Sequence, residues 1–203
     1  MRLVRRPGVE IAYWREGTGP PIVWIQGLNA DHSAWLSQVI AFQEGYDCIA
    51  LDNRDVGRSG RATADYTLAE MAEDVRAVLD DAEVEDAHVV GLSMGGAIAQ
   101  ELALNAPEWV RSLTLVSTFA RLDARLEATL ESWRAIYPIL GPREFARQSW
   151  PWLFTWRFFE RPTNLRNLQR YADQAPRPQE ADAFARQVQV TLGQDRRARL
   201  RAL

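Results

Sequence analysis

Cysteine, lysine, histidine and long apolar runs are all scarce in this chain of 203 residues. The single cysteine, Cys48, excludes a disulfide within the chain, and its apolar neighbours up to Leu51 predict a buried strand thiol. No apolar run approaches the roughly 18 residues that a membrane span requires. The first residues, Met1–Pro7, lack the apolar segment of a secretory signal. These absences predict a cytoplasmic protein without a membrane partner.

Positive charge comes from arginine alone, because the 24 basic residues include no lysine, and 27 acidic residues leave a net charge of −3. The arginines are scattered and form no basic stripe, which argues against nucleic acid as a partner. Cys/His clusters with zinc spacing and carboxylate runs with calcium spacing are absent from the sequence. Gly57-Arg58-Ser59-Gly60 matches neither a phosphate loop nor a dinucleotide fingerprint. No cofactor and no metal are implied.

What the chain does contain is a strand, a Gly-x-Ser-x-Gly turn and a helix in immediate succession. The β-branched pair Val89-Val90 precedes Gly91-Leu92-Ser93-Met94-Gly95, and a helix-forming run over 97–105 follows. In this context the pattern indicates a nucleophile elbow, a turn so tight that only glycine fits beside the serine. A helix that starts here points free N–H groups at a developing oxyanion. We therefore interpret Ser93 as a nucleophile, with an ordinary tight turn as the alternative.

Short buried strands alternate with amphipathic helices in the first part of the chain. Strands are expected at 9–15, 22–25, 48–51, 87–92 and 113–117, and helices at 33–44, from Thr67 onward and at 97–105. This alternation predicts an α/β fold, a mostly parallel sheet with helices on both faces. The loops 26–29 and 52–59 and the turn at Ser93 all leave carboxyl ends of strands. Ligands bind at that edge of such sheets, so we expect these loops to converge on one site.

The pattern changes after Ser117. Residues 119–199 show only helical segments and loops, broken by prolines, with a dense group of aromatic residues. We expect residues 1–118 to form the sheet part, 119–193 an inserted all-helical cap, and 194–203 a segment that returns toward the sheet. Most of these aromatic side chains can serve only to pack the cap against the sheet. The rest can line an apolar pocket above Ser93, and the candidates are Trp133, Tyr137, Trp152 and Trp156.

Three segments together resemble the α/β-hydrolase superfamily: the loop 26–29, the loop Asp52–Ser59 and the run Ala87–Gly96. The closer similarity, over about residues 9–118, is to capped esterases and lactonases such as 3-oxoadipate enol-lactonases and aclacinomycin methylesterases. The resemblance implies an α/β-hydrolase fold with Ser93 as nucleophile.

The same resemblance implies that the backbone N–H groups of Met94 and Leu28 form the oxyanion hole, with Gly27 and Leu28 beside the substrate. Family members usually carry His-Gly where this chain has Gln26-Gly27. Because the donor is a backbone N–H, the hole can persist, and Gln26 can brace the loop by hydrogen bonds.

The chain departs from the family at the acid and the base. The triad order on this fold is serine, acid, histidine, yet both histidines, His32 and His88, precede Ser93. His88 starts the elbow strand, where a structural role is expected. His32 is expected to pack its loop, with a rearranged triad as the alternative. Asp123 is a candidate for the acid of the triad, and the alternative is that it only starts a helix of the cap.

The other carboxylates at this edge, Asp52 and Asp55, are expected to anchor their loop through Arg54 and Arg58. We therefore expect the chain to be the N-terminal part of a longer hydrolase, with its last two strands, acid and histidine missing. The sheet would then expose an unpaired edge at 113–116. A complementing C-terminal polypeptide or a second copy is expected to cover it.

Two functions remain open from the sequence. The first is a serine hydrolase of small apolar carboxylic esters or lactones that works through an acyl-enzyme on Ser93, the present chain being catalytically incomplete alone. The second is a binding protein that holds a small apolar ligand under the cap without catalysis. Perhydrolysis of the cofactor-free haloperoxidase kind uses the same site and is a further alternative.

Overall fold

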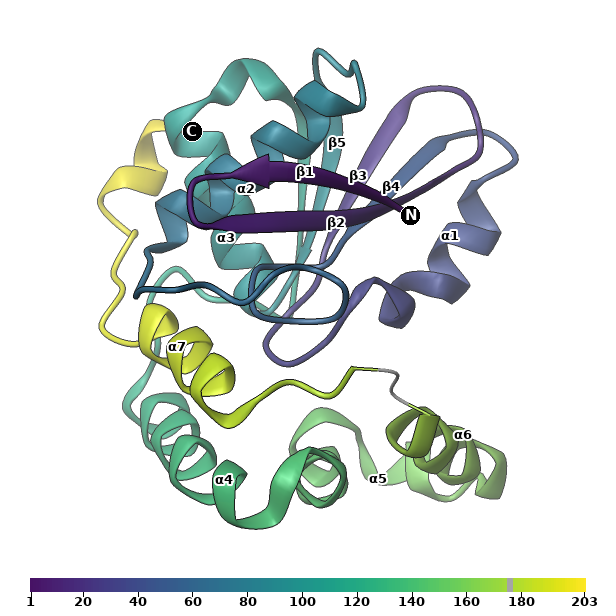
Figure 1. Ribbon diagram of the computed structural model, residues 1–203, viewed down its shortest axis with the longest axis vertical. Coiled ribbons are helices and arrows are strands. Elements are labelled where there is room, and N and C mark those ends of the chain that lie inside the picture. The colour runs from purple at the N-terminus through teal and green to yellow at the C-terminus, as the bar shows by residue number, and fades with distance from the viewer. Residues whose placement is uncertain (175–176) are drawn as a thin grey trace.

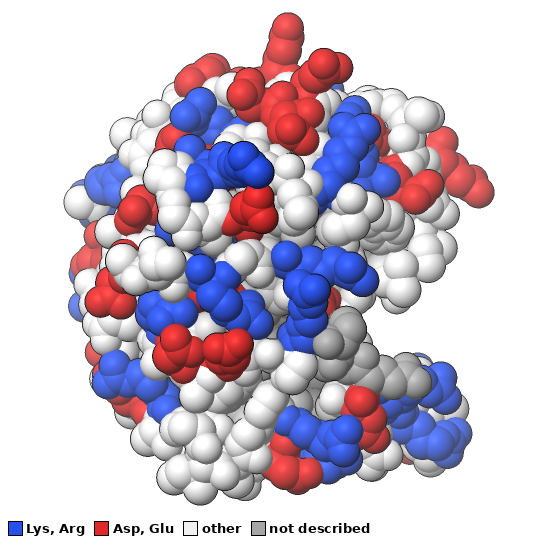
Figure 2. Space-filling view, viewed as in Figure 1, with Lys and Arg blue, Asp and Glu red and all other residues white. Residues whose placement is uncertain are grey.

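The structure, a computed structural model, describes residues 1–174 and 177–203. One half of the molecule is a twisted sheet with helices on both faces, and the other half consists of the helices that follow residue 123 (Figure 1). The face shown in Figure 2 is notched between these two halves. In the described residues no helix is long and apolar enough to cross a membrane.

The sheet has six strands in the spatial order β1-β2-β4-β3-β5-β6. Strands β3 to β6 run parallel to one another, and β1 and β2 add an antiparallel edge. This arrangement confirms the predicted mostly parallel sheet. The strands are β1 (Arg2–Arg6), β2 (Val9–Glu16), β3 (Pro21–Ile25), β4 (Asp47–Leu51), β5 (Ala87–Leu92) and β6 (Val110–Val116).

Strand β1 has no counterpart among the predicted strands. Three of its five residues are arginine, so the segment lacks the apolar alternation that indicates a strand. It forms because the turn at Gly8, with φ at +72°, folds the chain back so that β1 pairs along β2. Strand β1 therefore forms because its backbone pairs with β2, whereas the other strands are already indicated by the pattern of their side chains.

The helices of the sheet half follow the predicted alternation with one change. They are η1 (His32–Trp35), α1 (Leu36–Phe42), α2 (Leu68–Asp81), α3 (Met94–Asn105) and η2 (Pro107–Trp109). The helix expected over 33–44 is a 3₁₀ turn followed by a short α-helix, because the Asp31 side chain caps the backbone N–H of Ser33 and starts a tighter turn. The predicted capping box at Thr67 and Glu70 is present at the start of α2.

Apolar layers cover both faces of the sheet. Helices α2 and α3 pack Met71, Val75 and Ile98 against one face. On the other face, Val39 of α1 lies in a second cluster with Cys48, which is 1% exposed. The cysteine is therefore the buried strand thiol that the sequence predicts.

The second half contains α4 (Ala124–Leu153), α5 (Trp156–Phe159), α6 (Pro162–Gln174) and α7 (Ala181–Thr191). Prolines break these helices less than expected, since Pro138 and Pro151 lie inside α4. The interruption of α4 is at Gly141, whose φ of 71° is not helical and which precedes Pro142.

The last residues return to the sheet half. The Arg196 guanidinium, 1% exposed as a residue, donates from Nε to Gln100 Oε1 of α3 at 3.0 Å. Arg199, at the start of η3 (Arg199–Ala202), pairs with Glu101 of the same helix at 2.9 Å. Strand β6 ends the sheet, and its Leu115 and Val116 are exposed, at 43% and 36%.

Candidate functional site

The turn between β5 and α3 holds Ser93 in a conformation that non-glycine residues rarely adopt. Its backbone has φ 54° and ψ −120°, a strained region that persists only where the surroundings hold it. Its N–H donates to the Val116 carbonyl at 3.0 Å, and Thr118 Oγ1 donates to the Ser93 carbonyl at 2.6 Å. Strand β6 and the loop after it therefore hold the strained residue in place.

Glycine is required around Ser93 by close backbone contacts. A Cβ on Gly91 would lie 2.5 Å from the Gly95 carbonyl oxygen, and one on Gly95 would overlap the carbonyl oxygen of Ile25 at the end of β3. A Cβ on Gly96 would meet the Thr118 side chain at 2.5 Å. The sequence predicts such crowding for Gly91 and Gly95, and the structure identifies its partners.

The loop after β3 lies directly against Ser93. A Cβ on Gly27 would be 3.1 Å from Ser93 Cβ and 3.7 Å from its Oγ. Gln26, which is 3% exposed, accepts the Gly27 N–H on Oε1 at 2.7 Å, so it braces this loop as expected. Leu28 packs against both the sheet core and the core of the second half.

Met94 is the first residue of α3, so its backbone N–H has no acceptor inside the helix. It lies next to Ser93 and is 1% exposed. The N–H is therefore placed at the positive end of the helix dipole, where it can meet a developing negative charge.

Helix α7 ties the loops at this edge together through Gln187, which is fully buried. Its Nε2 donates to the Arg54 carbonyl at 2.9 Å, and its Oε1 accepts the N–H of Asn29 at 3.2 Å. The expected convergence of the loops after β3 and β4 is thus confirmed. Nothing in the sequence singles out Gln187, because its partners are backbone groups of segments far away in the chain.

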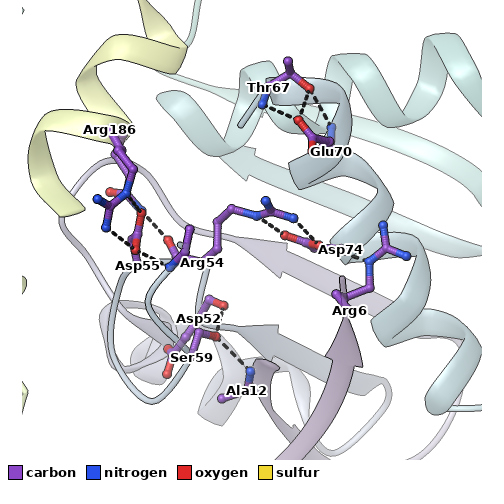
Figure 3. A network of polar contacts seen from close by, with 12 residues as sticks. Arg6, Ala12, Asp52, Arg54, Asp55, Ser59, Thr67, Glu70, Asp74 and Arg186 are labelled. Carbon is purple, nitrogen blue, oxygen red and sulfur yellow. Dashed lines mark hydrogen bonds and ion pairs between the residues drawn. The ribbon is translucent and has the colours of Figure 1, made fainter. Parts of the chain in front are cut away.

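The loop 52–59 is anchored by its carboxylates, but the predicted arginine partners are only partly right. Asp52 accepts the backbone N–H of Arg58 at 2.8 Å, not its guanidinium. Asp55 pairs with Arg186 of α7, at 2.9 and 3.0 Å, whereas Arg54 binds Asp74 of α2 (Figure 3). Sequence proximity suggested local pairs, and the packing of α2 and α7 on the loop provides closer ones.

His32 binds Asp52 rather than Ser93. Its Nδ1 lies 2.7 Å from Asp52 Oδ1, and its backbone N–H donates to the same oxygen. Ligand atoms of Asp31, His32 and Asp52 lie within 4.8 Å of one another, a grouping that the sequence did not predict. Asp31 already caps Ser33 there. The contacts shown by the structure therefore give His32 the expected role in packing its loop.

The remaining candidates for acid and base lie elsewhere. His88 Nδ1 is 2.7 Å from Ser112 Oγ, where β5 begins, at the opposite end of the strand from Ser93. The Asp123 carboxylate accepts the N–H of Leu126 at 2.8 Å and is the N-cap of α4. Both residues have the structural contacts expected for them.

The aromatic candidates divide into two groups. Tyr137 is buried and stacks on Phe184 of α7 at 4.0 Å, and Trp133 contacts Phe145 edge to face, so both belong to the core of the second half. Trp152 and Trp156 are 55% and 66% exposed. Their contact with a substrate remains a prediction.

The pKa of His32 makes stability depend on pH. Burial alone would lower that pKa, but the hydrogen bond and charge of Asp52 outweigh it and hold it above the ordinary 6.5. A raised native pKa stabilises the fold below about 6.5 and loses this contribution as pH rises through the native value. We expect the free energy of unfolding in urea to fall from pH 6 toward 9, and His32→Gln to flatten the fall. An unchanged slope in His32→Gln would contradict this assignment.

A strained serine between a parallel strand and a helix, with a glycine loop against it, defines the α/β-hydrolase class of proteins. The chain belongs to the alpha/beta hydrolase fold family, which it matches over residues 20–199.

Individual relatives agree with this membership. The chain is 41% identical over 138 residues to RutD of Azorhizobium caulinodans, assigned as a carbamate hydrolase, covering 68% of this chain and 52% of RutD. It is 39% identical over 132 residues to the rhodomycin D methylesterase DnrP of Streptomyces peucetius, covering 61% of this chain and 44% of DnrP. The chain thus spans about half the length of these relatives or less.

Solved structures share the fold over nearly the whole chain. A hydrolase from Pseudomonas aeruginosa superimposes with a TM-score of 0.82 at 28% identity, over 99% of this chain and 75% of that one. The enol-lactonase from Burkholderia xenovorans superimposes with a TM-score of 0.83 at 24% identity, over 96% of this chain and 74% of that one. The predicted α/β-hydrolase fold is confirmed.

Proposed function

We propose that this protein is a serine hydrolase of carboxylic esters or lactones and that Ser93 carries the acyl group. The observation on which the proposal rests is the strained backbone of Ser93 with the Gly27 loop pressed against its side chain. Native structures retain such strain at functional sites, and a residue that only connected a strand to a helix would not need it. The methylesterase and enol-lactonase names among the similar proteins support this class of substrate.

In the proposed reaction Ser93 Oγ attacks the carbonyl carbon, and its proton passes to a general base. The carbonyl oxygen becomes an oxyanion that accepts hydrogen bonds from the N–H groups of Leu28 and Met94. The carbon–oxygen bond to the alcohol then breaks, and the leaving oxygen takes up the proton. Water attacks the acyl-enzyme in the same way and releases the carboxylic acid, which restores Ser93.

The base and its acid partner are proposed to come from polypeptide outside these 203 residues. His32 is held by Asp52, and His88 lies at the far end of β5. The added polypeptide would pair with β6, the edge strand whose Leu115 and Val116 are exposed. A second copy of this chain could also cover and protect the same edge. It would contain only the residues that this chain already has, so it would add no new candidate for the base or the acid.

A serine-directed fluorophosphonate tests the nucleophile. We expect intact-mass measurements to show one phosphonyl adduct on the protein and none on Ser93→Ala, because the phosphonyl oxygen is stabilised by the same N–H groups. The chain alone should react slowly. A longer form that includes the expected C-terminal segment should react at least about 10⁴-fold faster, the order of the loss in kcat when the triad acid is replaced.

The matched control is Ser112→Ala, which removes an exposed serine that lies beside a histidine. It should label as the unchanged protein does. An adduct that survives Ser93→Ala, or no adduct on the longer form, would overturn the proposed reaction and favour a binding protein without catalysis.

A further inference from the structure

The loop 26–29, which follows β3 and packs on Ser93, has its first peptide unit fixed by buried side chains. The Gln26 carbonyl accepts a hydrogen bond from Asn53 Nδ2 at 2.8 Å. In the same peptide unit, the Gly27 N–H donates to Gln26 Oε1 at 2.7 Å. Gln26 and Asn53 are 3% and 2% exposed. Both polar groups of the unit that joins Gln26 to Gly27 are therefore paired, which holds its plane in one orientation.

The peptide unit after Leu28 is held from the other half of the molecule. The Asn29 N–H donates to Oε1 of Gln187, in helix α7, at 3.2 Å. The Gln187 side chain is fixed in turn, because it is fully buried and its Nε2 donates to the Arg54 carbonyl at 2.9 Å. The Tyr137 hydroxyl of α4 lies 3.4 Å from Asn29 Oδ1. Two helices of the second half thus reach the end of this loop.

The Leu28 N–H belongs to the peptide unit between these two fixed units. Of the N–H groups of Gly27, Leu28 and Asn29, only that of Leu28 has no acceptor among the described residues. Peptide units are planar, so the two fixed units also place the Cα atoms of Gly27 and Leu28. The unit between them can only turn about the line that joins these atoms, and the bond angles at both atoms limit that turn. The Leu28 N–H is therefore free and yet held in direction.

Asn29 needs such support, because its backbone is in the left-handed region. Its φ is 61°, a value that favours glycine. Conformations of this kind persist where the surroundings hold them. The hydrogen bond from the Asn29 N–H to Gln187 is one such restraint. Without it, Asn29 can relax toward an ordinary negative φ, and the peptide unit after Leu28 turns with it.

We propose that Gln187 is a positioning residue for the reaction, because it holds the Asn29 N–H and thereby directs the Leu28 N–H at the oxyanion. The inference rests on the proposed function, which assigns Leu28 as an oxyanion donor. Gln187 acts through Asn29, and it couples the position of helix α7 to that donor. A donor that turns away loses an interaction made chiefly in the transition state. Loss of the Gln187 amide should therefore slow the reaction of Ser93 in a protein that stays folded.

The variant Gln187→Met tests this assignment, because it keeps most of the side-chain volume and removes both hydrogen bonds. We expect the rate of Ser93 phosphonylation to fall by about 10- to 100-fold at a temperature at which circular dichroism shows the variant folded. The matched control is Gln189→Met, which changes an exposed glutamine of the same helix that binds Arg134. It should be labelled at the unchanged rate.

A second substitution separates positioning of the loop from general packing. In the Gln187→Met background, Asn29→Gly should raise the rate by about threefold or more, because glycine adopts a positive φ without strain. A side chain that only packed the helix would show no such rescue. An unchanged rate in Gln187→Met would overturn the assignment, and so would a slowed rate that Asn29→Gly does not raise.

Hydrogen exchange follows the loop without any reaction at Ser93. In Gln187→Met, the amides of residues 26–30 should exchange about threefold faster or more, relative to those of α2, than in the unchanged protein. Unchanged exchange there would overturn the inference, whatever the labelling shows. Absence of a Ser93 adduct on the unchanged protein would instead be a failure of the proposed function, so the two failures are distinct.

Discussion

Replacing Asp74 with alanine is expected to lower the free energy of unfolding by about 3–5 kcal/mol. Asp74 lies on α2, is 2% exposed, and accepts from Arg54 at 2.7 and 2.8 Å and from Arg6 at 3.2 Å (Figure 3). Arg54 is itself 6% exposed. Removing the carboxylate leaves a buried guanidinium without its counter-charge, which costs far more than the net gain from an intact pair.

The loss should extend to the site, because Arg54 belongs to the loop that Gln187 holds through the Arg54 carbonyl. Guanidinium chloride unfolding would measure the change. The control is Asp86→Ala, which breaks the exposed pair of Asp86 with Arg111 and should cost no more than about 1 kcal/mol. If Asp74→Ala cost no more than that control, the Arg54 pair would not be the buried anchor inferred here.

Replacing Gly95 with alanine is expected to destabilise the protein by about 3 kcal/mol or more. The added Cβ would overlap the Ile25 carbonyl oxygen and lie 2.6 Å from that of Gln26. Both neighbours are backbone atoms at the end of β3, so relief requires that α3 and the sheet move apart. That movement would also separate Ser93 from the Gly27 loop.

Thermal unfolding and phosphonate labelling of the same sample would measure both effects. Gly45→Ala is the matched control, because its Cβ would meet nothing within 4 Å and its φ is not positive. It should be neutral within about 0.5 kcal/mol. A Gly95→Ala protein as stable and as reactive as Gly45→Ala would contradict the close packing of the elbow.

The parts of the site that the sequence predicted are those with local causes. The Gly-x-Ser-x-Gly turn, the capping box at Thr67 and the buried strand of Cys48 each depend on neighbours within a few residues. The partners of Asp55 and Arg54 were wrong for the opposite reason. Ion pairs form with whatever the tertiary structure brings near, and here that was Arg186 and Asp74.

By itself, the sequence determined the order of strands β2 to β6 and of the α-helices between them, the parallel sheet and the serine turn. Periodicity and glycine spacing act through the backbone close to each residue. Only the tertiary structure decided that Gln187 bridges two loops. The hydrogen bond from Gln187 to the Arg54 carbonyl joins two residues that are 133 positions apart in the chain. No local pattern records such contacts, because burial and hydrogen-bond satisfaction are properties of the packed molecule.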